Sequence, residues 1–159
     1  MSVEANKAAV ERFGGEAFNN GDLSSSEELI APDIVDHDPA PGQAPGREGI
    51  EQFVDTIRTA FPDLQTTIDE MIGEGDYVAF RYTIEGTHQG EFMGVAPTGK
   101  RVSVSAMEML RFTDGKMVDR WGNTDQLGIL QQIGALPPIG QGEGEKGLAE
   151  KAKDKLTGE

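Results

Sequence analysis

Residues 77–84 read YVAFRYTI, and their side chains fall into two sets that alternate along the chain. One set is apolar and comprises Val78, Phe80, Tyr82 and Ile84. A β-strand with one buried face produces this alternation, because successive side chains point to opposite faces of a sheet. The stretch therefore predicts a half-buried strand.

More strands are predicted on either side of this one. Gly73-Glu74-Gly75-Asp76 turns the chain into it, Thr98-Gly99 turns the chain again, and Asp114-Gly115 is a strong hairpin signal. We expect four strands in meander order at about residues 64–72, 77–89, 101–113 and 116–123. A helix over about 126–133 follows them, with Gly134 just beyond its end.

Helices are predicted before the sheet. The apolar residues of 2–19 keep near-helical spacing, and a short second helix ends at Pro32, before a short strand at 34–38. Residues 39–46 are rich in proline and glycine and predict a loop, a candidate rim or lid. The clearest helical stripe follows and ends at Pro62; its members are Ile50, Phe53, Val54, Ile57 and Phe61.

Helices first and an antiparallel sheet afterwards predict an α+β fold, with helices covering one face of the sheet. Such a curved sheet can close into a cone around a pocket. A chain of 159 residues fits one compact domain. We place that domain at residues 1–136 and predict a flexible tail, rich in Gly, Glu and Lys, over 137–159.

The composition argues against several classes of partner and chemistry. The net charge of −14 opposes binding to nucleic acid or to an anionic membrane surface. No apolar run approaches the ~20 residues of a spanning helix, and the polar N-terminus is unlike a signal peptide, so we expect a cytoplasmic protein. The absence of cysteine excludes disulfides and thiolate chemistry, and no metal-binding, nucleotide-binding or serine-hydrolase motif is present.

Two histidines are candidates for chemistry. His37 lies between Asp36 and Asp38 and is either a functional group or a solvated, hydrogen-bonding residue at a strand end. His88 extends the apolar face of its strand, so it either points into a pocket or is a buried core histidine.

Glu108 is the unusual residue of the third predicted strand, because every neighbour on its face is apolar. Burying an unpaired carboxylate costs several kcal/mol, so Glu108 must be neutral, paired or exposed through a bulge. Arg81 or Arg111 could pair with it. Three further large side chains belong either to the core or to the wall of an apolar pocket: Met107, Met109 and Trp121.

Asp125 carries the most specific hypothesis. It shares one face with Trp121 and Asn123 at the end of the last predicted strand, where a cone-shaped sheet would meet its final helix. Strand ends around a pocket hold catalytic groups well. The alternative is structural, since Thr124-Asp125 before an apolar-periodic segment is also an ordinary helix N-cap signal.

Several short motifs, taken in order, resemble the SnoaL-like polyketide cyclase (ester cyclase) family over about residues 6–135. They include Asn20-Gly21-Asp22, Phe61-Pro62-Asp63, the run GTHQGEF at 86–92, Pro97-Thr98-Gly99-Lys100, Trp121 followed by Asp125, and Gln132-Ile133-Gly134. The resemblance implies the cone-shaped α+β barrel of the NTF2-like superfamily, a homodimer or homotetramer, and chemistry without a metal or organic cofactor.

The resemblance also implies a reaction, the intramolecular aldol-type ring closure of a bulky, apolar or aromatic carbonyl ester. The family's aspartate acid/base near the end of the last strand matches Asp125, which would take the proton α to an ester carbonyl and return one to the new alkoxide. Polar groups such as His88, His37 or Asn123 would stabilise the enolate. The remaining candidate substrate contacts are Trp121, Glu108, Arg111, Tyr82, Phe80, Met107 and Met109.

Three alternatives stay open at this point. The first is a non-catalytic small-molecule-binding protein in which Asp125 only caps the last helix. The second is proton shuttling of the ketosteroid-isomerase kind. The third is epoxide hydrolysis, for which Asp119, Arg111 and Asp125 supply the residue types.

Overall fold

The computed structural model describes residues 2–137. Helices α1 (Val3–Phe13), the π-helix η1 (Gly14–Asn19) and α2 (Ser26–Leu29) come first, followed by strand β1 (Ile30–Asp36) and helix α3 (Gly46–Ala60). Strands β2 (Gln65–Glu74), β3 (Tyr77–Thr87), β4 (Arg101–Thr113) and β5 (Lys116–Thr124) precede helix α4 (Gln126–Gln132). Beyond Pro137 the predicted tail lies outside the described residues, and the domain boundary stays a prediction.

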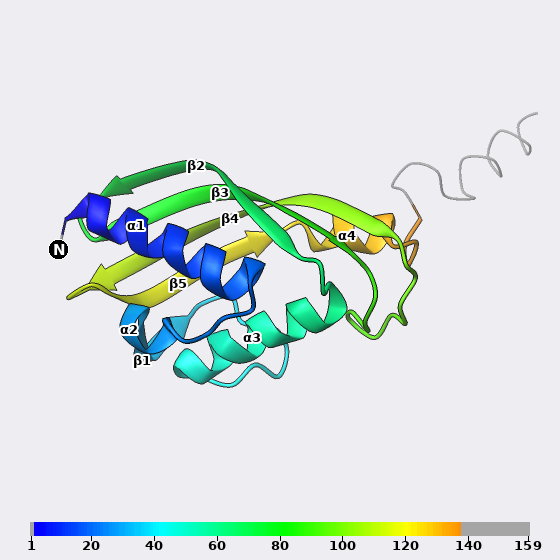
Figure 1. Cartoon of the computed structure of the whole chain (residues 1–159), viewed down its shortest axis with the longest axis horizontal. Coiled ribbons are helices and arrows are strands. Elements are labelled where there is room, and N and C mark those ends of the chain that lie inside the picture. The colour runs from blue at the N-terminus through cyan, green and yellow to red at the C-terminus, as the bar shows by residue number, and fades with distance from the viewer. Residues whose placement is uncertain (1, 138–159) are drawn as a thin grey trace, which may run out of the picture.

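The five strands form one curved sheet in the order β1-β5-β4-β3-β2. Strands β2 to β5 are antiparallel neighbours in sequence order, which confirms the predicted meander. β1 adds to the far side of β5 in parallel. The sheet does not close, and Figure 1 shows α1, α2 and α3 on the same side of it. The α+β fold with helices over one face is confirmed.

Two predicted boundaries before the sheet are wrong. The short helix stops at Leu29, and Ile30 already begins β1, so Pro32 lies inside a strand. An edge strand tolerates this proline, because the pairing with β5 is irregular between Ile30 and Val35 and no ladder bond needs its missing N–H. The opening helix also changes type, since its last part is the π-helix η1 beginning at Gly14.

The inner face of the sheet carries the core. Val78, Tyr82 and Ile84 are buried, which confirms the alternation in residues 77–84. The core has two clusters. One gathers α1, β1 and the ends of β4 and β5 around Phe13 and Phe112, and the other gathers the end of α3, the middle of the sheet and α4 around Phe61.

Gly90 joins the segment between β3 and β4 to the end of α3. Its N–H donates to the Ala60 carbonyl oxygen over 3.0 Å, and a Cβ atom on Gly90 would lie 2.1 Å from the Thr59 carbonyl oxygen. We expect Gly90→Ala to lower the free energy of unfolding by about 1–3 kcal/mol, because backbone must move. Urea denaturation measures this. Gly15→Ala is the control, since nothing lies within 4 Å of its added methyl group, and it should leave stability equal or higher. Equal stability of the two variants would contradict this packing.

Candidate active site

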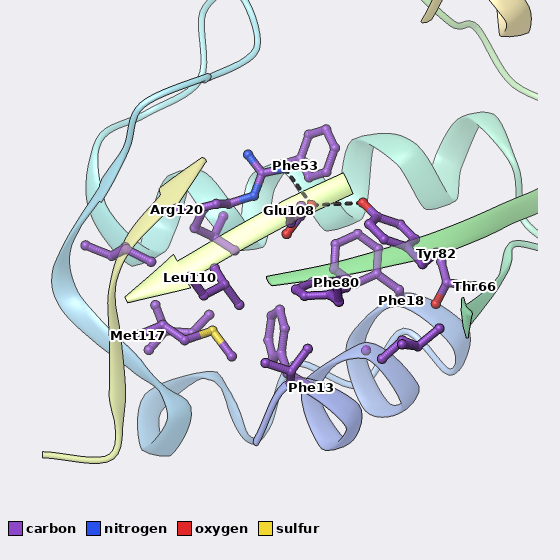
Figure 2. Close-up of a pocket in the computed structure, with 16 residues that line it drawn as sticks. Phe13, Phe18, Phe53, Thr66, Phe80, Tyr82, Glu108, Leu110, Met117 and Arg120 are labelled. Atoms are coloured by element: carbon purple, nitrogen blue, oxygen red, sulfur yellow. Dashed lines mark hydrogen bonds and ion pairs between the residues drawn. The ribbon is translucent and has the colours of Figure 1, made fainter. Parts of the chain in front are cut away.

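An apolar cavity of about 60 Å³ lies between the inner face of the sheet and the helices. Its walls come from α1, η1, β1, α3 and strands β2 to β5. Figure 2 shows aromatic side chains, among them Phe13, Phe18 and Phe80, around this space. The polar lining is confined to four side chains, which are Thr66, Tyr82, Glu108 and Arg120.

Glu108 places a carboxylate in this apolar wall. It lies on the inner face of β4, between Phe80 of β3 and Gly122 of β5, and its side chain is only 10% exposed. Its Oε1 atom accepts hydrogen bonds from the Tyr82 hydroxyl at 2.8 Å and from the Arg120 guanidinium at 2.7 Å. Of the three states that the sequence leaves open, neutral, paired or exposed, the structure shows the paired one.

The partner of Glu108 differs from both arginines considered from the sequence. Arg81 points to the outer face, where it lies 3.9 Å from Glu70, and Arg111 binds Asp119. Arg120 takes their place because the pairing of β4 with β5 shifts between Arg111 and Phe112. The shift gives β5 one extra residue, which reverses the alternation and turns Arg120 inward.

Arg120 also binds Asp36 at the end of β1. Its guanidinium donates to both Asp36 oxygens, at 3.0 and 3.1 Å, and Gln43 donates to the same carboxylate at 2.9 Å. Arg120 also lies over the Phe53 ring, 5.6 Å from its centroid. A continuous polar chain thus runs from the 37–45 loop through Asp36 and Arg120 to Glu108 in the cavity.

Burial and neighbouring charge act on the ionisable groups of this chain in different ways. Burial disfavours the charged guanidinium of Arg120, but attraction to Glu108 and Asp36 outweighs it and raises the pKa. Burial, followed by the charge of Glu108, raises the pKa of Tyr82 well above its ordinary value. Tyr82 therefore stays a hydrogen-bond donor to Glu108 through the neutral range.

Six of the predicted site residues lie on the opposite, outer face of the sheet. His37 follows β1, stacks on Trp121 with ring centroids 4.4 Å apart, and shares a 2.8 Å hydrogen bond with Asp119. Arg111 donates to the same carboxylate at 2.7 Å. The hydrogen bond with His37, and then Arg111, lower the pKa of Asp119. Met107, Met109 and Asn123 share this outer face through their register with β3 and β5.

His88 and Asp125 lie outside the cavity lining. His88 is fully buried beside Phe61, and its Nδ1 atom accepts from the Thr98 backbone N–H at 3.2 Å. Asp125 is exposed and caps α4, accepting from the Gly128 N–H at 2.8 Å. These geometries match the core-histidine and N-cap alternatives. Catalytic roles for the two residues stay predictions.

Within residues 2–137, no group of three or more His, Asp or Glu side chains is placed to hold a metal ion. None of the helices in this range is long and apolar enough to cross a membrane.

A curved sheet and helices around an apolar cavity, with one carboxylate in the cavity wall, define a class of small α+β pocket proteins. The sequence places the chain more narrowly, because the model of the SnoaL-like polyketide cyclase family matches residues 8–133. The chain belongs to this family.

Similar proteins come from Streptomyces. The nogalonic acid methyl ester cyclase of Streptomyces nogalater is 31% identical over 130 residues, which cover 79% of this chain and 96% of that protein. The structure of AclR, a putative hydroxylase from Streptomyces galilaeus, is similar with a TM-score of 0.76 and 34% identity, covering 99% of this chain and 100% of that one. IdmH, a putative polyketide cyclase from Streptomyces antibioticus, has a TM-score of 0.71 and 39% identity, covering 81% of this chain and 98% of that one.

Because Arg120 pairs with two buried carboxylates, we expect its loss to lower stability much more than the loss of an exposed arginine. Arg120→Met leaves Asp36 and Glu108 buried without their cation, and we expect it to lower the free energy of unfolding by about 3–5 kcal/mol. Arg81→Met is the control, because its outer-face pair with Glu70 is exposed and contributes at most about 1 kcal/mol. Denaturant titration of both variants measures the difference. Similar losses for the two would show that the buried network is not the stronger constraint.

Proposed function

We propose that this protein is a SnoaL-type cyclase that closes a ring of an aromatic, ester-bearing carbonyl compound by an intramolecular aldol reaction, without a cofactor. Family membership supports the proposal, together with the S. nogalater relative that is named as a methyl ester cyclase. The observation that carries it is the Glu108 carboxylate in the wall of an otherwise apolar cavity.

Glu108 has the features of a proton acceptor. Both of its hydrogen bonds end on Oε1, and no bond to Oε2 occurs among residues 2–137. One oxygen is thus held in place by Tyr82 and Arg120 while the other is available to a substrate. A carbon acid that is already activated by an ester and an aromatic ring needs only a weak base, so a carboxylate suffices.

In the proposed reaction, Glu108 takes the proton from the carbon α to the ester carbonyl. The resulting enolate carbon attacks a ketone of the same molecule, which forms one carbon–carbon bond and leaves an alkoxide. Glu108 then returns the proton to that alkoxide, so the product is an isomer of the substrate. The Arg120 guanidinium, the cation beside Glu108, would stabilise the negative charge that develops on the substrate oxygens, while the Tyr82 hydroxyl donates its one proton to Glu108.

Asp125 is the competing proton-transfer group, and the family resemblance supports it. Its exposed carboxylate is engaged at the start of α4, whereas Glu108 lines the cavity. We therefore propose Glu108 as the acid/base. Asp125, with His88 in support, stays the second candidate.

A pair of isosteric variants separates the two carboxylates. We expect Glu108→Gln to slow turnover of nogalonic acid methyl ester by about 10²–10⁴-fold, the usual contribution of a general base. Asp125→Asn should keep the wild-type rate and stability, because asparagine caps a helix as well as aspartate. The reverse result would assign the proton transfer to Asp125. Two active variants would contradict acid/base catalysis by either group.

Product mass distinguishes cyclisation from a second candidate reaction. The similarity to AclR over 99% of the chain makes hydroxylation the alternative to consider. Ring closure leaves the mass of the substrate unchanged, whereas hydroxylation adds one oxygen atom. Binding without any change in the ester would instead favour the non-catalytic binding protein.

We also propose that the protein is a homo-oligomer, a dimer or tetramer, assembled through the outer face of the sheet. Register places Ile72, Ala79, Met109 and Trp121 side by side across four strands. Ile72 is 71% exposed and the nearby Met107 is 61% exposed. Among the described helices, α1, α2 and α3 lie on the other side of the sheet, as Figure 1 shows. A second copy that covers this apolar row would remove it from water.

Charged residues introduced into the apolar row test the assembly. The double variant Ile72→Lys/Met109→Lys should convert the oligomer into a folded monomer, because two lysines in each copy would be buried unpaired. Light scattering after gel filtration gives the mass. Gln65→Lys is the matched control, since Gln65 lies on the same strand and face as Ile72 but at the other end. A monomeric wild-type protein, or a double variant of unchanged mass, would contradict the proposal.

A cytoplasmic location and the lack of nucleic-acid or membrane partners stay predictions. The location rests on the polar N-terminus and the absence of a long apolar run, and the lack of these partners rests on the net charge of −14, which disfavours contact with other polyanions.

A further inference from the structure

The cavity is too small for the substrate class proposed above. Its volume of about 60 Å³ is a small fraction of the about 300–1,000 Å³ found in pockets for drug-sized ligands. A compound with several fused rings can reach Glu108 only if part of the cavity wall moves or if most of the compound lies elsewhere.

A second hollow lies directly beyond one wall. It measures about 100 Å³ and runs between the 40–43 part of the proline-rich loop and helix α3, where Gln52 and Thr56 line it. We call it the loop groove. Phe53 is the residue that lines both the loop groove and the cavity. The Phe53 side chain thus separates the buried carboxylate from a groove that opens on the surface.

Phe53 is a half-buried partition between the cavity and the loop groove. Its side chain is half-buried, in contrast to the fully buried Val54 beside it on α3. It touches Phe18 of η1 edge-on, with ring centroids 6.3 Å apart, and Arg120 lies over its face. Figure 2 shows Phe53 next to Arg120 at the end of the cavity where Glu108 lies. A rotation of one aromatic ring would therefore expose the polar chain to the loop groove.

We propose that the cavity and the loop groove form one divided substrate site with Phe53 as its gate. The part of the substrate that reacts enters the cavity beside Glu108, and the rest of a flat aromatic carbonyl compound lies in the loop groove. The substrate class rests on the proposed function, while the route does not. An aromatic ligand replaces the contacts that Phe53 loses with Phe18 and Arg120, because its π-face can take the same positions.

The loop groove offers contacts suited to such a compound. Ala40, Pro41 and Gly42 give it an apolar side. On the other side the Oε1 atom of Gln52 accepts from the Ala44 N–H at 3.0 Å, and no bond from its Nε2 occurs within residues 2–137. Gln52 therefore keeps an amide donor for a carbonyl oxygen of the ligand. Gln43 anchors the loop to Asp36, which couples the groove to the same polar chain as Glu108.

Association kinetics test the gate without any need for turnover. The probe is anthraquinone, a neutral planar aromatic ketone, followed by stopped-flow absorbance. Phe53→Ala should raise the association rate constant about tenfold, because the site no longer waits for a minor open state. Thr56→Trp places a large side chain in the loop groove at an exposed helix position and should lower the rate about tenfold. Thr59→Trp, exposed on the same helix outside both hollows, should leave it unchanged.

The comparison of Thr56→Trp with Thr59→Trp tests the route even if Phe53→Ala does not fold. Equal rates for these two variants would overturn the proposed route, and so would a lack of anthraquinone binding by both the wild type and Phe53→Ala. The same measurement in a Glu108→Gln background separates the two proposals. If the association rate still responds to Thr56→Trp, the divided site is supported even when no cyclase activity is found. If the protein has cyclase activity but the rate does not respond, the divided site is contradicted and the proposed function is not.

Discussion

One buried guanidinium constrains the whole molecule. Arg120 needs carboxylates at both ends, and it takes Asp36 from the edge strand β1 and Glu108 from the central strand β4. Because an unpaired buried charge is very unfavourable, these strands must adopt the register that brings the three side chains together. The hydrogen bond from Gln43 to Asp36 then fixes the 37–45 loop to the same cluster. The ion pairs of Arg120 therefore fix the position of the polar end of the cavity, while the apolar side chains of the cavity wall keep these charges away from water.

Such a network is a poor means of gaining stability. Replacing buried ion pairs by apolar side chains of similar volume is often neutral or favourable, so its presence points to another requirement. We propose that the requirement here is a carboxylate held in an apolar cavity. Tyr82 and Arg120 provide the donors that keep Glu108 there, and Gly122 opposite it leaves the space, since a Cβ atom at that position would lie 2.6 Å from the Arg120 guanidinium. The chemistry that we propose for Glu108 and the register of the strands thus depend on the same contacts.

Local patterns predicted most of the fold and only part of the site. Period-two alternation, hairpin glycines and prolines located the strands and helices, because those signals act over a few residues. The same alternation identified Phe80, Tyr82 and Glu108, which do line the cavity. It failed for Arg120, because the irregular pairing of β5 with β4 reverses the alternation, and for Asp36, because β1 pairs with a strand far away in sequence. The sequence showed that a buried Glu108 could need a cationic partner, but it suggested Arg81 or Arg111 rather than Arg120.

Two polar clusters link the end of β1 to β5, one on the inner face of the sheet and one on the outer face. Asp36 and Arg120 pair on the inside, while the residues after and before them, His37 and Asp119, pair on the outside. The outer pair holds β1 on β5 in the register that the inner pair requires, and it does so without entering the cavity.

The pKa of Asp119 is lowered in the folded chain, so this support is present at neutral pH and is lost as the pH falls through that lowered pKa. Trp121 stacks on His37 at the edge of the apolar row, so a copy bound there would remove the outer pair from water, which increases the attraction within the pair and adds a desolvation cost. The assembly that we propose on one face would in this way be coupled to the arrangement of charges on the other.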